Sequence, residues 1–270
     1  MATTGRKTAF VFTGGGSLGA IQVGMVRVLL ASGVFPDFVV GASVGAINAA
    51  YFACAPDVSG VAALERIWGG IRRADIFPFS LASLFGLIKH PGNIVDPGGL
   101  RRVIEANLPC ARIEETKIPL HIMATNHHGQ AVRLSGGPAV EAILASSAIP
   151  GVFPPVEIDG DFLMDGAVAA NTPVRLAAEL GASRIIILPT GYACALPEPP
   201  RTVIGKALHA ITLMIAWQLM HELEVIPREI EVHLVPTLCP LAISPLDFSA
   251  SRQLIERAAE SSRKWIESGG

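Results

Sequence analysis

Two glycine-rich turns, each between a short β-favouring run and a helical stretch, constrain the fold of this chain most strongly. Residues 8–13 (TAFVFT) lead into a run of glycines that begins at Gly14, and residues 38–40 (FVV) lead into a turn of small residues over 41–45. Two further β-branched runs continue the rhythm, at 118–125 and 185–188. Short apolar strands that alternate with helices are typical of a largely parallel sheet covered by helices, so the sequence predicts an α/β fold.

The low charge content narrows the class of protein. The 270 residues are 50% hydrophobic and only 16% charged, with a net charge of −2, whereas an average soluble domain is about 25% charged. A disordered chain would lack this apolar content, and a nucleic-acid-binding domain would show a basic surplus. We therefore predict a globular protein that handles apolar ligands and does not bind nucleic acid.

Two apolar stretches come close to the length of a membrane span, which is about 20 residues. Residues 38–56 contain glycines, a serine and an asparagine, so a buried strand–turn–helix is expected there. Residues 207–221 (ALHAITLMIAWQLMH) are too short and predict a buried helix, with Met214, Trp217 and Met220 packed in the core. The alternative for these three is a wall for an acyl chain or a surface that touches a membrane. No transmembrane segment is predicted.

The N-terminal residues and the cysteines bear on location. The apolar stretch 9–12 that follows Arg6 and Lys7 is too short for the hydrophobic part of a secretory signal. The four cysteines show neither a Cys-x-x-Cys pair nor the density of a disulfide framework; they are Cys54, Cys110, Cys194 and Cys239. We therefore expect a cytoplasmic protein, with transient peripheral contact to a membrane surface left open.

The first turn (GGGSLG, 14–19) also fits the G-x-G-x-x-G fingerprint of dinucleotide-binding folds. That fingerprint requires an acidic residue at the end of the second strand, where it holds the ribose hydroxyls. Here the only nearby acid, Asp37, comes before that strand, and the end of the strand carries the small residues 41–45. The position of the acid therefore argues against dinucleotide binding.

The second turn (GASVG, 41–45) is a G-x-S-x-G sequence between a strand and a helix. Such an elbow holds its serine in a strained turn and presents the hydroxyl at a helix N-terminus, whose dipole stabilises developing negative charge. The sequence therefore predicts that Ser43 is a nucleophile. The first turn follows the neighbouring strand and ends at the same edge of the sheet, so the backbone N–H groups of Gly15 and Gly16 are expected to form an oxyanion hole.

The base that takes the proton from Ser43 has two candidates. An α/β-hydrolase would use a downstream histidine, and three satisfy that order: His209, His221 and His233. Ser43 comes early for that fold, however, and two of these histidines fall on an apolar helix. The other candidate is Asp165, 122 residues after the serine, which is followed by Gly166 and Ala167. Two small residues would let this carboxylate pack closely against the elbow.

The three motifs, in this order, resemble those of the patatin-like phospholipase family. The resemblance covers about residues 8–190 and extends to 145–155 (ASSAIPGVFPP) and 171–173 (NTP). It implies a three-layer α/β/α fold with a central, mostly parallel sheet. Residues 8–190 would form the catalytic domain, and residues 191–270 would be an extension that completes the same domain.

The resemblance also implies a lipid acyl hydrolase with a Ser–Asp dyad, without a catalytic histidine, a cofactor or a metal. Ser43 would attack the ester carbonyl and Asp165 would accept its proton, while Gly15 and Gly16 would hold the oxyanion. Further glycines would shape the turns, at Gly14, Gly19, Gly41, Gly45 and Gly166.

Position 18 departs from the family pattern, which often has a basic residue just before the last glycine of the loop. Leu18 cannot make a bidentate contact to a lipid phosphate. Neutral acyl esters are therefore favoured over phospholipids as substrates, unless the fold brings another arginine near the glycine loop. The candidates are Arg101, Arg102 and Arg133. The same departure leaves a slow lipid-binding or regulatory protein as the alternative function.

Residues 76–99 interrupt the strand–helix rhythm with a segment rich in Phe, Leu, Ile, Pro and Gly. We expect a packed helical excursion that covers the sheet. The alternative is a mobile apolar cap over a substrate entrance.

Overall fold

A central mixed sheet organises the computed structural model, which describes residues 6–77, 95–169 and 173–270. The strand order is β5-β6-β3-β2-β1-β7-β8, with β4 paired to β3. The strands are β1 (Thr8–Phe12), β2 (Phe38–Ala42), β3 (Leu120–Asn126), β4 (Ala131–Leu134), β5 (Val156–Ile158), β6 (Asp161–Asp165), β7 (Arg184–Leu188) and β8 (Glu231–Leu234). Five neighbouring strands pair in parallel, in the spatial order β3-β2-β1-β7-β8. The pairs that involve β4, β5 or β6 are antiparallel.

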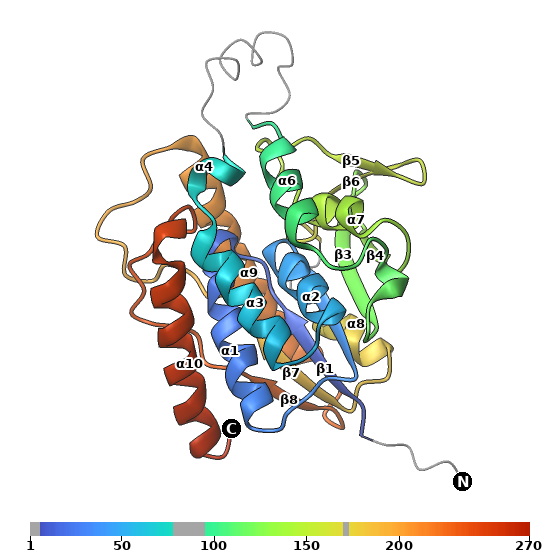
Figure 1. Ribbon diagram of the computed structural model, residues 1–270, viewed down its shortest axis with the longest axis vertical. Coiled ribbons are helices and arrows are strands. Elements are labelled where there is room, and N and C mark those ends of the chain that lie inside the picture. Colours follow the sequence, from blue (N-terminus) through green and yellow to red (C-terminus); the bar gives the residue numbers. More distant parts are fainter. Residues whose placement is uncertain (1–5, 78–94, 170–172) are drawn as a thin grey trace.

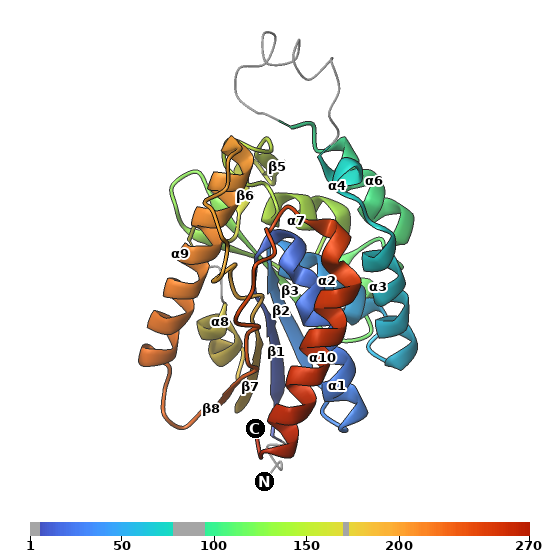
Figure 2. The same ribbon diagram turned by 90° about the vertical axis from the view of Figure 1, so that its left-hand side faces the viewer.

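Helices cover both faces of the sheet, which gives three layers (Figures 1 and 2). One layer contains α1 (Ala20–Ala31), α2 (Val44–Cys54), α3 (Val58–Gly70), α6 (Gly98–Asn107), α7 (Ala139–Ser146) and α10 (Ser251–Glu267). The opposite layer contains α8 (Val174–Glu179) and α9 (Val203–Val225). The predicted α/β/α fold with a mostly parallel sheet is therefore confirmed.

The residue pattern of β1 shows why both faces are covered. Successive side chains of a strand point to opposite faces of the sheet. Phe10 and Phe12 lie in the larger buried cluster, where both rings contact Phe52 of α2. Ala9 and Val11 lie in a second buried cluster, together with side chains of α8 and α9. A strand that is apolar on both faces needs a helical layer on each.

The topology brings three segments to one edge of the sheet. β1 lies between β2 and β7, so the chain connections diverge from it, and ligand sites of such sheets lie at the carboxyl ends of these strands. The glycine loop follows β1 and Ser43 follows β2. Because β6 is antiparallel to β3, its last residue, Asp165, is opposite Ala124 and comes level with the end of β2, where Ala42 is opposite Met123.

The C-terminal part of the chain joins the same layers. β8 pairs parallel with β7 and extends the sheet. α10 packs so closely on α1 that a Cβ at Gly24 would lie 3.0 Å from the backbone nitrogen of Ala259. The division of the chain near residue 190 remains a prediction.

Helix α9 differs from the expectation of a buried helix. One face packs on the domain through buried residues, Gly205, Leu208, Thr212, Ile215 and Leu219. The other face leaves Met214, Trp217 and Met220 exposed by 50%, 79% and 55%. The prediction that these three pack in the core is therefore wrong, because the Met-Trp-Met spacing fits an outward face as well as an inward one. By length and composition α9 is also the one helix of the described residues that could span a membrane.

The cysteines also differ from expectation, because all four are paired. Cys54, at the end of α2, bonds Cys110, which follows α6. Cys194 bonds Cys239, and these two residues flank the stretch that contains α9 and β8. Wide spacing in the sequence gave no sign of either pair.

The segment 76–99, predicted as an excursion or a cap, lies mainly outside the described residues. The structure describes only its ends, where Ile76 is the last residue of the short helix α4 (Arg73–Ile76) and Phe77 is buried.

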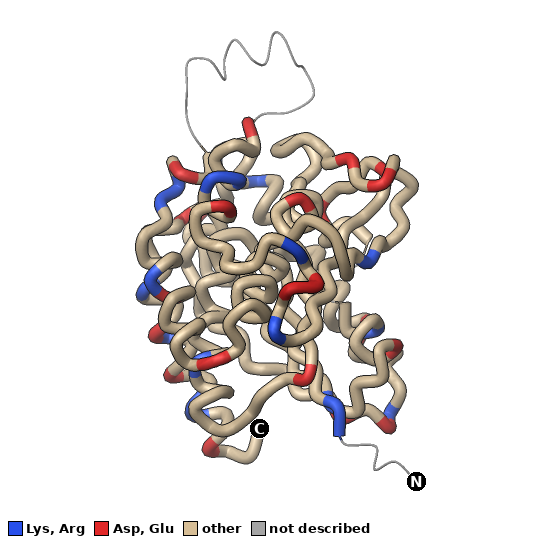
Figure 3. The backbone as a smooth tube through the Cα atoms, turned by 45° about the vertical axis from the view of Figure 1, so that its right-hand side comes forward, with Lys and Arg blue, Asp and Glu red and all other residues tan. Residues whose placement is uncertain are grey.

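Basic and acidic residues are interspersed along the described chain, with long uncharged stretches between them (Figure 3).

Candidate active site

Ser43 lies in a sharp turn between β2 and α2. Its backbone has φ 55° and ψ −129°, a conformation that L-residues rarely adopt and that recurs at functional sites. Glycine neighbours make the turn possible: a Cβ at Gly41 would lie 2.5 Å from the Gly45 carbonyl oxygen, and a Cβ at Gly45 would collide with the backbone of Phe12. The serine is the N-cap of α2 and is only 7% exposed.

Asp165 accepts a hydrogen bond from Ser43. The distance from Ser43 Oγ to Asp165 Oδ2 is 2.7 Å, and the other carboxyl oxygen accepts the Ala167 N–H at 2.8 Å. Asp165 is completely buried, and this burial raises its pKa to about 6, although the hydrogen bonds from Ala167 and Ser43 act to lower it. A carboxylate within hydrogen-bond reach of a hydroxyl can act as its general base.

A second serine, Ser146, fixes the elbow. Its Oγ accepts the backbone N–H of Ser43 at 2.9 Å and donates to the Met123 carbonyl at 2.6 Å. The Ser146 carbonyl accepts the N–H of Gly166, where a Cβ would collide with Met123. Ser146 thus joins the nucleophile turn to the turn that carries Asp165. Ser146 falls within the segment 145–155 that carries the family resemblance, but no role for this serine was predicted from the sequence.

The glycine loop lies beside Ser43. Gly15 and Gly16 have positive φ values of 150° and 61°, and a Cβ at Gly16 would lie 2.6 Å from the Pro245 carbonyl oxygen. Within the described part of the chain, the N–H groups of both glycines donate to no protein group. Gly16 lines the same cavity as Ser43. These N–H groups are therefore free to bind an oxyanion.

A buried polar network holds this loop against α2 and α3. Asn48 donates to the Gly19 carbonyl at 2.9 Å and to Gln22 Oε1 at 2.7 Å, and it accepts the Trp68 indole N–H at 2.9 Å. Gln22 in turn donates to the Thr13 carbonyl at 2.8 Å. Both amide side chains are fully buried. This network was not predicted from the sequence, because Gln22 and Asn48 look there like ordinary polar residues of two apolar helices.

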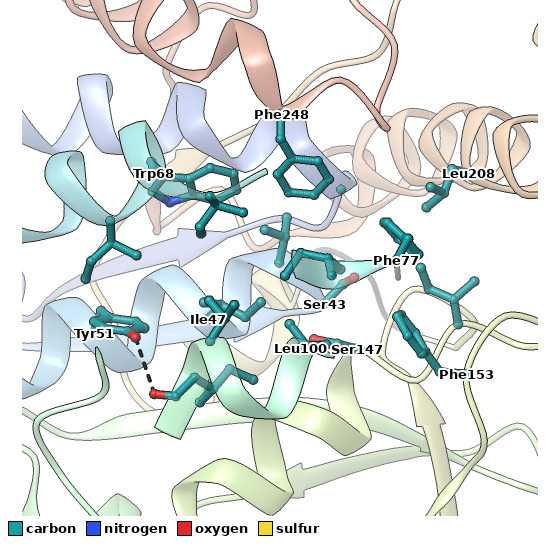
Figure 4. A pocket seen from close by; sticks show the side chains of 18 of the residues that line it. Ser43, Ile47, Tyr51, Trp68, Phe77, Leu100, Ser147, Phe153, Leu208 and Phe248 are labelled. Carbon is teal, nitrogen blue, oxygen red and sulfur yellow. Dashed lines mark hydrogen bonds between the residues drawn. The ribbon is translucent and has the colours of Figure 1, made fainter. Parts of the chain in front are cut away.

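An apolar cavity opens from Ser43 between α2, α3 and α6 (Figure 4). Most of its lining is aliphatic or aromatic, as in Ile47, Trp68, Leu100 and Phe248. The polar lining residues are few: Ser43, Tyr51 and Ser147. Such a cavity suits a hydrocarbon chain whose ester group lies at the serine.

The other predicted candidates lie away from the cavity. His209 and His221 are on α9 and His233 is on β8, where it contacts Glu231; none of the three lines the cavity. Arg101 pairs with Glu141 at 2.6 Å. Neither Arg101, Arg102 nor Arg133 lines the cavity, so they do not replace the missing basic residue.

Leu18 is completely buried in the larger core cluster. Its side chain therefore does not face a ligand in the cavity.

Comparison with known proteins agrees with these motifs. The profile of the family described as patatin-like phospholipase matches residues 10–178. Among curated proteins, the chain is 28% identical over 208 residues to patatin-like phospholipase domain-containing protein 7 of Rattus norvegicus, and 28% identical over 190 residues to lysophospholipase NTE1 of Pyricularia oryzae. These matches cover 76% and 69% of the chain but only 15% and 12% of the relatives.

Solved structures with a similar arrangement are more distant. VipD from Legionella pneumophila aligns with a TM-score of 0.49 at 14% identity, covering 97% of this chain and 66% of that protein. The human group IVD cytosolic phospholipase A2 aligns with a TM-score of 0.46 at 13% identity, covering 96% of this chain and 57% of that protein. The family profile spans more than half of the chain and includes all three motifs. The chain therefore belongs to the patatin-like phospholipase family.

Proposed function

We propose that the protein is a serine hydrolase of lipid acyl esters, with Ser43 as the nucleophile and Asp165 as the base. The observation that carries this proposal is the 2.7 Å hydrogen bond from the Ser43 hydroxyl, which lines an apolar cavity, to a fully buried carboxylate. The curated relatives bear names of phospholipases and a lysophospholipase, which supports a lipid substrate.

The reaction would proceed through an acyl-enzyme. Ser43 Oγ forms a bond to the ester carbonyl carbon while its proton passes to Asp165 Oδ2, and the N–H groups of Gly15 and Gly16 stabilise the oxyanion. The intermediate collapses, the ester C–O bond breaks, and Asp165 returns the proton to the leaving alkoxide. Water then attacks the acyl carbon and gives its proton to Asp165. The bond from this carbon to Ser43 Oγ breaks, Asp165 returns the proton to Ser43 Oγ, and the fatty acid leaves.

The environment of Asp165 supports its role as a base. With a pKa of about 6, the carboxyl group is ionised at neutral pH. It is also more basic than an exposed aspartate, whose pKa is about 3.9. Burial thus gives a carboxylate the proton affinity that other serine hydrolases obtain from histidine.

The cavity favours a neutral acyl ester as the substrate. Among the described residues its lining contains no arginine or lysine, and Leu18 is not part of it. A phosphate at this position would find no charged partner among the described lining residues. The alternative function, a slow lipid-binding or regulatory protein, has less support, because such a protein needs neither the Ser43–Asp165 hydrogen bond nor the free N–H groups of the glycine loop.

The decisive experiment is hydrolysis of p-nitrophenyl esters by the wild type and by Ser43→Ala. The wild type should turn over and Ser43→Ala should fall by at least about 1000-fold, since the nucleophile is lost. Labelling with a fluorophosphonate should modify the wild type at Ser43 and leave the variant unmodified. Ser59→Ala, at an exposed serine bonded only to Asp57, is the matched control and should keep wild-type rates. An active Ser43→Ala would refute the assignment, and tight lipid binding without turnover would favour the binding protein.

We further propose that the protein contacts a membrane surface peripherally, through the exposed face of α9. From residue 203 to residue 221 this helix carries one charged residue, Lys206, while Trp217 and Met214 point outward. Its inward face is anchored in the domain, and Leu208 lines the cavity. A helix with an apolar solvent-exposed face, whose opposite face is packed on the domain, is suited to lie on a bilayer rather than cross it.

The compartment remains a prediction. Cytoplasmic location was expected from the sequence, but two cysteine pairs favour an oxidising compartment, where disulfides persist. The two compartments are separated by isolating the protein in the presence of an alkylating agent and counting the alkylated cysteines. Four alkylated cysteines support the cytoplasm, and none supports an oxidising compartment.

A further inference from the structure

One arm of the cavity runs along α2 away from Ser43. Val44, Ile47 and Tyr51 all line it, and residues three or four apart share one face of a helix. Figure 4 shows Ile47 between Ser43 and Tyr51, with Trp68 on one side of this arm and Leu100 on the other. The arm therefore follows a row of side chains that starts at the nucleophile.

Tyr51 is the last residue of this row. It is 6% exposed, and its hydroxyl donates a long hydrogen bond of 3.5 Å to the Ile104 carbonyl of α6. The neighbouring lining residues Trp68 and Ile104 are 3% and 0% exposed, so the phenol lies among buried side chains. The Cys54–Cys110 bridge joins α2 to the chain after α6 just beyond this point. The far end of the arm is thus surrounded by buried side chains, and the bridge fixes the two chain segments beside it.

The length of the arm follows from helix geometry. Eight residues separate Ser43 from Tyr51, which at about 1.5 Å per residue is about 12 Å. An extended chain advances roughly 1.2 Å per bond, since a polypeptide of three bonds per residue spans at most about 3.6 Å. An acyl group attached to Ser43 therefore meets the phenol after about ten carbons.

We infer that Tyr51 sets the upper limit of acyl-chain length, so that the enzyme prefers esters of medium-chain acids of about eight to ten carbons. This inference rests on the proposed hydrolase function. Each methylene that enters the arm should raise kcat/KM about fourfold, as expected for burial of one CH₂ group. Beyond the phenol further carbons find no apolar space, and the gain should stop.

The test is the chain-length profile of p-nitrophenyl esters from two to sixteen carbons. The wild type should rise to a maximum at eight to ten carbons and then fall. Tyr51→Ala should move this maximum to longer chains by roughly four carbons, the space that the phenol ring occupies at about 1.2 Å per bond. Tyr51→Phe keeps the ring and is the matched control, so its maximum should stay where the wild type has it.

A second variant tests the same inference without opening the core. Ile47→Phe fills the middle of the arm and should move the maximum to about six carbons or fewer. Active Tyr51→Ala and Ile47→Phe proteins that both keep the wild-type profile would overturn the inference. Titration of Ser43 with a fluorophosphonate separates this failure from failure of the proposed function. If the wild type neither reacts nor turns over, the hydrolase proposal itself is wrong.

Discussion

At the scale of single residues, the site depends on one carboxylate that is held away from water. Asp165 has no exposed surface, and its two oxygens are occupied by Ser43 and Ala167. Burial of a charge without a cationic partner costs free energy, which appears here as a pKa raised to about 6. The position thus favours reactivity over stability.

Asp165→Asn is expected to abolish turnover and to stabilise the fold at pH 8. The unfolded aspartate has a pKa of about 3.9, so the folded state binds the proton more tightly and the contribution of Asp165 to stability is lost as pH rises from about 4 through 6. A difference of two pKa units corresponds to about 3 kcal/mol of the free energy of unfolding. The wild type loses this amount when Asp165 ionises, whereas a neutral asparagine does not ionise. Urea unfolding should show a variant more stable by up to about this amount at pH 8 and by about half of it at pH 5.

The same ionisation predicts that kcat/KM of the wild type falls tenfold per pH unit below about 6. An Asp165→Asn protein that is less stable than the wild type at pH 8 would contradict the raised pKa of Asp165. A wild-type kcat/KM that stays constant down to pH 4 would contradict it as well.

At the scale of elements, what the sequence could predict depended on how local the signal was. The strand before Gly14 and the elbow at Ser43 were predictable, because each is encoded by consecutive residues. The roles of Ser146 and Asn48 were not, since their partners lie 103 and 26 residues away in the chain. The prediction that α9 buries this face was wrong for a related reason. Helical periodicity places Trp217 and Met214 on one face of the helix but does not indicate whether that face contacts the core or solvent.

The network around Asn48 gives a prediction at this scale. Asn48→Leu keeps the size of the side chain but leaves Gln22 Oε1 and the Trp68 indole N–H buried without the partners that they have in the wild type. Each such loss costs about 1–3 kcal/mol, so we expect a destabilisation of about 3 kcal/mol and, because the glycine loop loosens, a fall in kcat/KM of about tenfold. Denaturant unfolding and ester hydrolysis measure both effects.

Asn107→Leu, at an exposed asparagine of α6, is the control and should change stability by less than about 0.5 kcal/mol. An Asn48→Leu protein that unfolds like this control would show that the network does not hold the loop.

At the scale of the whole molecule, the apolar face of α9 predicts how the protein meets its substrate. Trp217 is 79% exposed, and an indole at a bilayer interface gains apolar contact while its N–H stays hydrated. Vesicles that contain anionic lipid should shift the tryptophan emission to shorter wavelength in the wild type and in Trp265→Phe, but not in Trp217→Phe. Trp217→Glu should weaken binding at least about tenfold in a flotation assay. Vesicle binding that is unchanged in Trp217→Glu would refute this contact, and a concentration-dependent dimer lost in this variant would assign the face to a second copy.

The bridge between Cys54 and Cys110 turns much of the cavity wall into a covalent ring. The stretch between these cysteines, which lie 56 positions apart, supplies Leu64, Trp68, Phe77 and Leu100 to the lining, and its ends meet beside Tyr51. A single proteolytic cut anywhere within this stretch would therefore leave one covalent molecule. A nicked protein would run as a single band until a reductant is added, and only then would it separate into two fragments.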